Sequence, residues 1–432
     1  MKIYIYKNLI PEEVEQLTLR PAIDTGKTFE IVKPILKDIK ENGLASAINY
    51  AKKFDGFTGD SLAVTRSEFD EAEKKLDVKI KDAIKTAADN IRRFHEKQLP
   101  KGYSVETMEG INCSREFRAI ENAGLYIPGG TAVLPSTMLM LAIPAQIAGC
   151  PRIAACSPAK EGVINLPLLY AAKVCGVNEF YKIGGAQAVA LMAYGDKSIK
   201  KVNKIFGPGN QYVTAAKMLV SIDPSGCAID MPAGPSEVLI IADETANPSF
   251  IAADLLSQAE HGADSQAILV TTSELLAGKI KTETEIQLNK LPRKDFAKQA
   301  LENSFILIVE NIDDAAAFSN RYAPEHLIMN FANASGYTSK ITNAGSVFIG
   351  QYSPESVGDY ASGTNHSLPT SGYAKTSGGV SVESFMKSIT FQELTPEGLK
   401  RISATVETLA ETEGLRAHKN AVTIRLEKNS RS

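Results

Sequence analysis

Short apolar segments alternate with glycine-rich turns and apolar helical segments from about residue 120 to residue 220, and this alternation constrains the fold most strongly. Three such units begin at Gly124, Glu179 and Lys204, and each has glycine in the turn before the expected helix. Strands that alternate with helices of this length form mostly parallel sheets, because each helix returns the chain to the starting edge. The sequence therefore predicts an α/β fold.

A second α/β series is expected from about Glu237 onward. Apolar runs of strand length occupy 237–242, 267–271, 305–309 and 346–349. Between the first two, Asn247 is suited to cap a helix and Pro248 to begin it. A chain of 432 residues is also too long for one ordinary domain. We therefore expect at least two α/β domains.

The segments outside these series have a different character. Residues 1 to about 25 look like a short arm, and one long helix is expected from a Ser67 cap to about Gln98, where Pro100 stops it. Residues 351–379 are rich in Gly, Ser, Pro and Thr, which is typical of a functional or disordered loop. An ordered segment over 384–394 and two helices over 396–413 and 415–427 are expected to follow.

Composition excludes several classes of protein. The formal net charge is -3 and 22% of residues are charged, which argues against a nucleic-acid partner. The longest apolar stretch, 132–150, is interrupted by Pro135 and Pro144, so we expect a buried helix and no membrane partner. No signal peptide is visible at the N-terminus. The five cysteines are odd in number and form no CxxC pair, which suggests reduced thiols in the cytoplasm.

The five histidines differ in their settings. His95 ends a charged helix and is expected on the surface. His261 follows Gln258 at a spacing of three, which places both side chains on one face of a helix end. Metal-binding helices use this geometry, although a solvated helix end explains the pair equally simply. Glu325 and His326 are adjacent, and a histidine is the natural general base for an alcohol while a carboxylate beside it can activate water.

The remaining candidates are ambiguous when they are taken alone. Asp359 and His366 lie in the long loop and are also explained as turn residues. Glu413 and His418 lie five residues apart across Gly414, which is too far for one helical face unless the glycine ends the helix. By themselves they suggest only a polar surface.

Eight segments together resemble the histidinol dehydrogenase family over about 20–428. The segments are YIPGGTAVLPSTMLM from Tyr126, IGGAQAVALMAYG from Ile183, KIFGPGNQYVTAAK from Lys204, DMPAGPSEVLIIAD from Asp230, DLLSQAEHG from Asp254, RYAPEHL from Arg321, SVGDYASGTNHSLPTSG from Ser356 and GLRAHKNAVTIRL from Gly414. No single motif is decisive, but eight in the expected order make the resemblance specific.

The resemblance assigns roles to the candidate residues. It implies a zinc site whose ligands are Gln258, His261, Asp359 and His418. It implies a catalytic pair, Glu325 and His326, and NAD contacts at Tyr126, Gln187 and Asn210. The implied substrate-binding residues are Ser236, Gln258, His261, His326, Asp359, Glu413 and His418. His366 is expected to approach the substrate as well.

The resemblance also implies an architecture. We expect an α/β fold of two incomplete Rossmann-like domains with parallel-type sheets, small N- and C-terminal extension domains, and an intertwined homodimer with shared active sites. The expected divisions are an N-terminal arm over 1–22, a first α/β domain over 23–125 plus 237–380 with most metal and catalytic residues, a second over 126–236 that contacts NAD, and a C-terminal helical tail over 381–432.

The implied activity is the last step of histidine biosynthesis. L-Histidinol would be oxidised through bound L-histidinaldehyde to L-histidine with two NAD+, and each subunit would carry one Zn2+. The GxGxxG fingerprint of many dinucleotide-binding domains is absent. Three alternatives stay open from the residues alone: an aldehyde dehydrogenase that uses a cysteine, a zinc-dependent hydrolase, and a non-enzymatic two-lobed metal- or ligand-binding protein.

Overall fold

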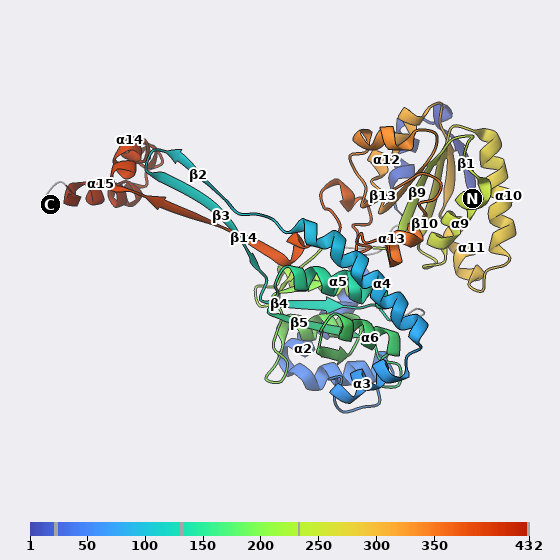
Figure 1. Ribbon diagram of the computed structural model, residues 1–432, viewed down its shortest axis with the longest axis horizontal. Helices are drawn as coiled ribbons and strands as arrows, with labels where there is room; N and C mark the ends of the chain where they lie inside the picture. The colour runs from blue at the N-terminus through green and yellow to red at the C-terminus, as the bar shows by residue number, and fades with distance from the viewer. Residues whose placement is uncertain (21–24, 130–133, 232–233, 430–432) are drawn as a thin grey trace.

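The computed structural model describes residues 1–20, 25–129, 134–231 and 234–429. Two lobes, each built on a parallel sheet, lie side by side, and a long arm projects from one of them (Figure 1). None of the helices in these ranges combines the length and the apolar composition needed to cross a bilayer. The expected α/β class with parallel sheets is confirmed.

The first lobe contains a six-stranded sheet in the order β1-β11-β10-β9-β12-β13, and every neighbouring pair is parallel. Its strands are β1 (Lys2–Ile5), β9 (Glu237–Ala242), β10 (Gln266–Thr271), β11 (Phe305–Ile308), β12 (His326–Asn330) and β13 (Ser346–Ile349). The four strands expected from apolar runs are present. The expected N-terminal arm instead begins with β1, which pairs with the edge of this sheet; residues 21 and 22 of that arm lie outside the described residues.

Helices cover both faces of this sheet, and its central strands β9 and β10 are therefore buried along their whole length and mostly apolar. The helices α1 (Pro11–Thr18) and α12 (Ile312–Tyr322) pack on one face. On the other face lie α9 (Pro248–Ala259) and α10 (Glu274–Leu288), with α11 (Lys294–Glu302) against α9. Asn247 caps α9 as expected, since its Oδ1 accepts a hydrogen bond from Ser249 N at 2.9 Å.

The second lobe contains a five-stranded parallel sheet in the order β6-β5-β4-β7-β8. The strands are β4 (Asn122–Tyr126), β5 (Arg152–Ser157), β6 (Glu179–Lys182), β7 (Lys204–Phe206) and β8 (Ala228–Ile229). One face carries α2 (Thr25–Phe54), α7 (Gly185–Tyr194) and α8 (Gln211–Ile222). The opposite face carries α3 (Arg66–Lys75), α4 (Val78–His95), α5 (Pro135–Ile147) and α6 (Leu166–Val174).

The helices between residues 25 and 95 therefore pack differently from our expected division. We assigned 23–125 to the same domain as 237–380, but Val32 and Ile39 of α2 share a core with Val189 of the second lobe. Ile84 and Ile91 of α4 join the core on its other face. An amphipathic pattern shows that a helix packs on something apolar, but it does not show which sheet supplies that surface.

The single long helix expected over 67–98 is wrong. The chain forms α3 and α4, separated by Leu76 and Asp77. Thr65, two residues before the expected cap, accepts a hydrogen bond from Glu68 N, and Asp77 Oδ1 accepts one from Lys79 N at 2.8 Å. Each cap satisfies free amide groups at a helix start, so two capped helices replace one continuous helix.

The arm is a three-stranded antiparallel sheet with a helical tip (Figure 1). It consists of β2 (Tyr103–Met108), β3 (Ile111–Ala119) and β14 (Met386–Leu394), paired in the order β14-β3-β2. The tip is formed by α14 (Pro396–Thr412) and α15 (Arg416–Asn429), which pack on each other. The two expected C-terminal helices are thus present, and they lie far from both lobes.

The segment 351–379 connects the two lobes. It contains a short helix, α13 (Glu355–Tyr360), and a 3-10 turn at Tyr373–Lys375. Asn365 Nδ2 donates a hydrogen bond to Met140 O at 2.6 Å and lies 3.3 Å from His95 Nε2. His95 is completely buried, so its expected place on the surface is wrong: its Nδ1 lies 2.8 Å from Ile91 O, and its ring supports this connection. Further 3-10 turns occur at Tyr6–Asn8, Glu96–Gln98, Ala334–Lys340 and Glu383–Phe385.

Candidate active site

The candidate site lies at the amino edge of the first-lobe sheet. His326 is the first residue of β12 and pairs with Val238 near the start of β9. Each helix returns the chain to the beginning of the next strand, so the C-terminal end of α9, with Gln258 and His261, also reaches this edge. The short helix α13 supplies a further wall. Three elements that are distant in sequence thus converge on one place.

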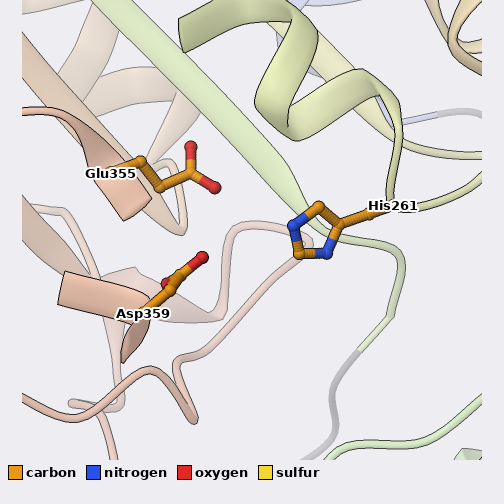
Figure 2. Close-up of side chains that lie close together, drawn as sticks. All are labelled: His261, Glu355 and Asp359. Atoms are coloured by element: carbon orange, nitrogen blue, oxygen red, sulfur yellow. The ribbon is translucent and has the colours of Figure 1, made fainter. Parts of the chain in front are cut away.

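His261, Glu355 and Asp359 form a cluster that has the composition of a metal site. One potential ligand atom from each residue lies within 4.8 Å of the other two. Figure 2 shows the His261 ring facing the two carboxylates, which project side by side from α13. Glu355 and Asp359 are four residues apart and therefore share one face of this helix. A nitrogen donor with carboxylate oxygens suits zinc and similar divalent metals.

Several buried polar atoms at this site have no hydrogen-bond partner among the described residues. Gln258 is fully buried, yet neither Oε1 nor Nε2 of its amide is paired. Glu355 Oε2 and His366 Nε2 are also unpaired. Buried polar atoms nearly always have a hydrogen-bond partner in folded proteins. Several unpaired atoms in one place therefore indicate a site that binds an ion or ligand. The donor set fits a metal ion together with a polar ligand.

Glu325 and His326 lie next to this cluster. His326 Nε2 is 3.5 Å from Asp359 Oδ1, and His326 Nδ1 is 3.7 Å from Glu325 Oε2 and 3.8 Å from Glu355 Oε1. These separations bring three carboxylates around one imidazole. His326 Nδ1 also lies 3.3 Å from the carbonyl oxygen of Glu237, which orients the ring.

Glu237 and Arg20 form hydrogen bonds that fix the position of Glu325. Glu325 Oε2 accepts a hydrogen bond from Glu237 N at 2.9 Å, and Glu237 Oε2 accepts one from Arg20 Nε at 2.9 Å. The Arg20 guanidinium also stacks 3.5 Å above the centre of the Tyr322 ring. The charge of Glu237 is thus paired, and its backbone fixes the carboxyl group of Glu325.

Burial and mutual charge perturb the pKa values of these groups. Burial raises the pKa of Glu325 to about 8 and that of Glu355 to about 8. For His326, burial alone would lower the pKa, but the carboxylates of Glu355, Glu325 and Asp359 raise it to about 10. The site therefore favours positive charge, and perturbed groups of this kind are characteristic of functional sites.

Two further expected residues border the site. Ser236 directly precedes β9 and is half-buried. Burial lowers the pKa of His366 to about 4, although Asp359 opposes this change. His366 is therefore neutral near pH 7 and able to accept a hydrogen bond or bind a metal.

Glu413 and His418 are not brought to this cluster. Both are exposed at the tip of the arm, in and beside the turn between α14 and α15. Figure 1 shows this tip at the opposite end of the molecule from α9 and α13. Of the expected metal ligands, His261 and Asp359 converge within the chain, Gln258 is buried three residues before His261, and His418 lies away from them.

The expected NAD contacts line a separate cavity of about 1030 Å³ in the second lobe. Tyr126 ends β4, Gln187 lies in the first turn of α7, and Asn210 precedes α8. The cavity therefore lies beyond the carboxyl ends of the strands, where open α/β sheets usually bind nucleotides. Tyr126 Oη accepts a hydrogen bond from Gly185 N at 3.1 Å, and Asn210 Oδ1 accepts one from Tyr212 N at 3.1 Å.

Sequence reasoning missed Glu355. The available signal was its spacing of four from Asp359, but the segment was interpreted as a loop without helical periodicity.

The alternative of an aldehyde dehydrogenase that uses a cysteine finds no support in the positions of the thiols. Cys113 lies on β3 of the arm and Cys156 in the core of the second lobe, while burial raises the pKa of the Cys150 thiol to about 11. An activated thiolate requires the opposite shift.

Comparison with known proteins gives a consistent result. The family model described as histidinol dehydrogenase matches residues 18–426. The chain is 52% identical to a histidinol dehydrogenase of Bacteroides thetaiotaomicron over 427 residues, 99% of each chain. It is 50% identical to one of Aliivibrio fischeri over 429 residues, 99% of this chain and 97% of the other. The crystal structure of histidinol dehydrogenase from Elizabethkingia anophelis superimposes with a TM-score of 0.94 at 51% identity and covers 100% of this chain and 99% of that one.

Proposed function

This chain belongs to the histidinol dehydrogenase family, and from this premise we propose that it oxidises L-histidinol through bound L-histidinaldehyde to L-histidine with two NAD+ and one Zn2+ per subunit. The observation that carries the proposal is the convergence of the Glu325–His326 pair with the His261, Glu355 and Asp359 cluster. The alternative functions against which this proposal is tested are a zinc-dependent hydrolase and a two-lobed binding protein.

The zinc would be held by His261, Asp359 and Gln258 of this chain. The unpaired amide atoms of Gln258 support this assignment, because a carbonyl oxygen bound to a metal would satisfy one of them. When bound, the ion would hold the polar groups of the substrate and fix the reacting carbon near His326. Glu355 is either an additional ligand or a group that orients the others from α13.

In both oxidations His326 would take a proton from a hydroxyl group, and NAD+ would serve as the hydride acceptor. The first proton comes from the alcohol and the second from the hydrated aldehyde. For this role His326 must be neutral, and its raised pKa indicates that the three carboxylates need compensation by another positive charge. A divalent cation held by His261 and Asp359 would supply that compensation.

Glu325 activates the water that adds to the aldehyde. It is buried beside His326, and the hydrogen bond from Glu237 N holds one of its carboxyl oxygens. A buried carboxyl group with a pKa of about 8 is a stronger base than an ordinary one, which suits removal of a proton from water.

We further propose a homodimer in which the arm completes the site of the partner subunit. Apolar side chains are exposed on the arm, including Val105 on β2 and Phe391 on β14. A narrow antiparallel sheet with exposed apolar residues is stabilised when a second surface covers it. A twofold arrangement would let the arm tip carry His418 and Glu413 to the other subunit. All five cysteines are free, which supports a cytoplasmic location.

The direct test is the absorbance of NADH formed from histidinol and NAD+ with this protein as the only catalyst. We expect two NADH for each histidinol consumed and histidine as the product. Hydrolysis of a substrate without NAD+ would favour the hydrolase alternative. Tight binding of histidinol without any NADH would favour the binding-protein alternative.

A further inference from the structure

Asp55 is a carboxylate in the second-lobe cavity to which neither the sequence analysis nor the family resemblance assigns a role. It follows α2 directly and is half-buried at the cavity wall. Asp55 Oδ2 accepts hydrogen bonds from Gly184 N at 3.0 Å and from Gln187 Nε2 at 3.2 Å. These bonds fix the carboxylate at the beginning of α7, next to a residue that we expect to contact NAD.

Several of the amide groups at which a phosphate usually binds are already occupied here. Free amides at helix starts attract anions. At α7, however, Asp55 takes the Gly184 amide and the Tyr126 hydroxyl takes the Gly185 amide. At α8 the Asn210 side chain takes the amides of the first turn. A fixed carboxylate thus stands where a phosphate would otherwise be stabilised.

The second oxygen of Asp55 remains available. Asp55 Oδ1 accepts no hydrogen bond from the described residues, and none of the described ion pairs includes Asp55. Among the described residues, the cavity wall contains two acidic side chains, Asp55 and Glu161, and one basic side chain, Lys160. The wall is therefore negative by one charge, and Asp55 is the acidic group that is rigidly held.

The apolar surroundings indicate which part of a dinucleotide lies near Asp55. Ile31, Ile35 and Phe54 of α2 line the cavity on the side from which Asp55 comes. An aromatic and aliphatic wall suits a base such as adenine. Its ribose would then lie against the carboxylate.

We propose that Asp55 accepts hydrogen bonds from the adenosine ribose hydroxyls of NAD and makes the cavity select against a 2′-phosphorylated dinucleotide. This inference rests on the proposed function, since it requires the cavity to bind the dinucleotide. A neutral ribose diol can donate to Asp55 Oδ1. A 2′-phosphate brings further negative charge to a carboxylate that has no cationic partner, and like charges repel.

The test measures the dissociation constants of NAD and NADP by calorimetry for the unmodified protein and for Asp55→Asn. The asparagine keeps an oxygen for the Gly184 amide but removes the charge. The variant should bind NAD more weakly, because a hydrogen bond to a charged group is lost, and NADP more tightly, because the repulsion is removed. We therefore expect the ratio of the NADP dissociation constant to the NAD dissociation constant to fall by about tenfold or more. The matched control is Asp60→Asn, which removes an equal charge from an exposed position outside the cavity wall and should leave the ratio unchanged.

A second measurement needs no variant. The unmodified protein should bind 2′-deoxy-NAD about tenfold more weakly than NAD, because the hydroxyl that donates to Asp55 is missing. Equal affinities for NAD and 2′-deoxy-NAD would overturn the role of Asp55 but not the assignment of the cavity. The same holds if Asp55→Asn still binds NAD and leaves the ratio of the NADP and NAD dissociation constants unchanged. Failure of the unmodified protein to bind either dinucleotide would overturn the assignment of the cavity as well.

Discussion

His326 lies among three carboxylates, and its environment decides what it can do at neutral pH. The side chains of Glu325, Glu355 and Asp359 all approach its ring within 4 Å. The negative charge of these groups raises the pKa of the imidazole, and a cation bound beside them would lower it again. The ability of His326 to accept a proton would therefore depend on whether a cation occupies the cluster of His261, Glu355 and Asp359.

The first prediction separates the two catalytic neighbours. Glu325→Gln keeps the shape of the side chain but removes the base, so oxidation of the aldehyde should slow by about 10²–10⁴ while oxidation of the alcohol changes much less. His326→Asn should slow both half-reactions, because each requires loss of a hydroxyl proton. Single-turnover kinetics with histidinol and with histidinaldehyde would measure this. Equal losses in both half-reactions for Glu325→Gln would contradict the assignment.

The second prediction concerns Asp254, one turn before Gln258 on α9. Its carboxyl group is buried without a hydrogen bond from the described residues, and burial raises its pKa from 3.8 to about 7. Between pH 4 and pH 7 the folded protein binds more protons than the unfolded chain, so this group's contribution to stability falls as pH rises and the penalty is complete above pH 7.

Asp254→Asn should therefore stabilise the protein at pH 8 by roughly 1–4 kcal/mol, at about 1.4 kcal/mol per pKa unit, and should give no gain at pH 4. Thermal unfolding at the two pH values would measure the difference. Asp82→Asn, at an exposed position of α4, is the matched control and should show no such trend. A gain of the same size at both pH values would show that charge is not the cause.

At the scale of elements, the end of α9 and the helix α13 form the two sides of the candidate metal site. The end of α9 provides Gln258 and His261, and one face of α13 provides Glu355 and Asp359. Helices place such groups more firmly than a loop would, because the backbone fixes the spacing. The pairing of these two elements therefore explains how residues about a hundred positions apart could hold one ion.

The third prediction tests Glu355, the member of the cluster that the family resemblance does not include. Glu355→Gln should weaken zinc retention by about 10–100-fold, the usual loss for a group that ligates or orients a ligand. Competition with a chromogenic chelator, followed by elemental analysis, would measure it. Glu260→Gln, next to His261 but outside the cluster, is the control. Unchanged retention in Glu355→Gln would remove this residue from the site.

The sequence predicted some elements well because their physical causes are local. β9 and β10 are continuous apolar runs covered on both faces, and Asn247 caps α9 with its own side chain. β12 was not predicted, because it begins with the polar pair that forms the site. β2 and β3 were also missed, since they are largely exposed and give no core-facing pattern.

The site was predictable only in part for the same reason. The sequence paired Gln258 with His261 through helical spacing, but it could not show that α13 would stand opposite them. The sequence also left open whether the C-terminal tail, with His418, packs against the lobes of the same chain. In the structure the strands β3 and β14 pair along nine positions and carry the tail outward, a long-range contact that no local signal reveals.

At the scale of the whole molecule, the arm is the feature on which the proposed shared site depends. β14 leads away from the second lobe, and α14 and α15 end far from both sheets (Figure 1). Glu413 and His418 are exposed at that tip. In the homodimer that we propose, a chain of this shape would supply the first-lobe cluster to one site and the tip to another.

The most direct test of this account is complementation between two inactive variants. His261→Ala removes a ligand from the lobe and His418→Ala removes the residue at the tip. If the arm crosses to the partner, a mixed dimer contains one doubly altered site and one intact site. Random mixing makes half of the dimers mixed, so about a quarter of all sites should recover activity after the two chains are unfolded and refolded together.

Verified mixed dimers that remain inactive would contradict the shared site, because every site would then carry one lesion from its own chain. Recovery of activity near a quarter of the unmodified level, absent when either variant is refolded alone, is the result that the structure leads us to expect.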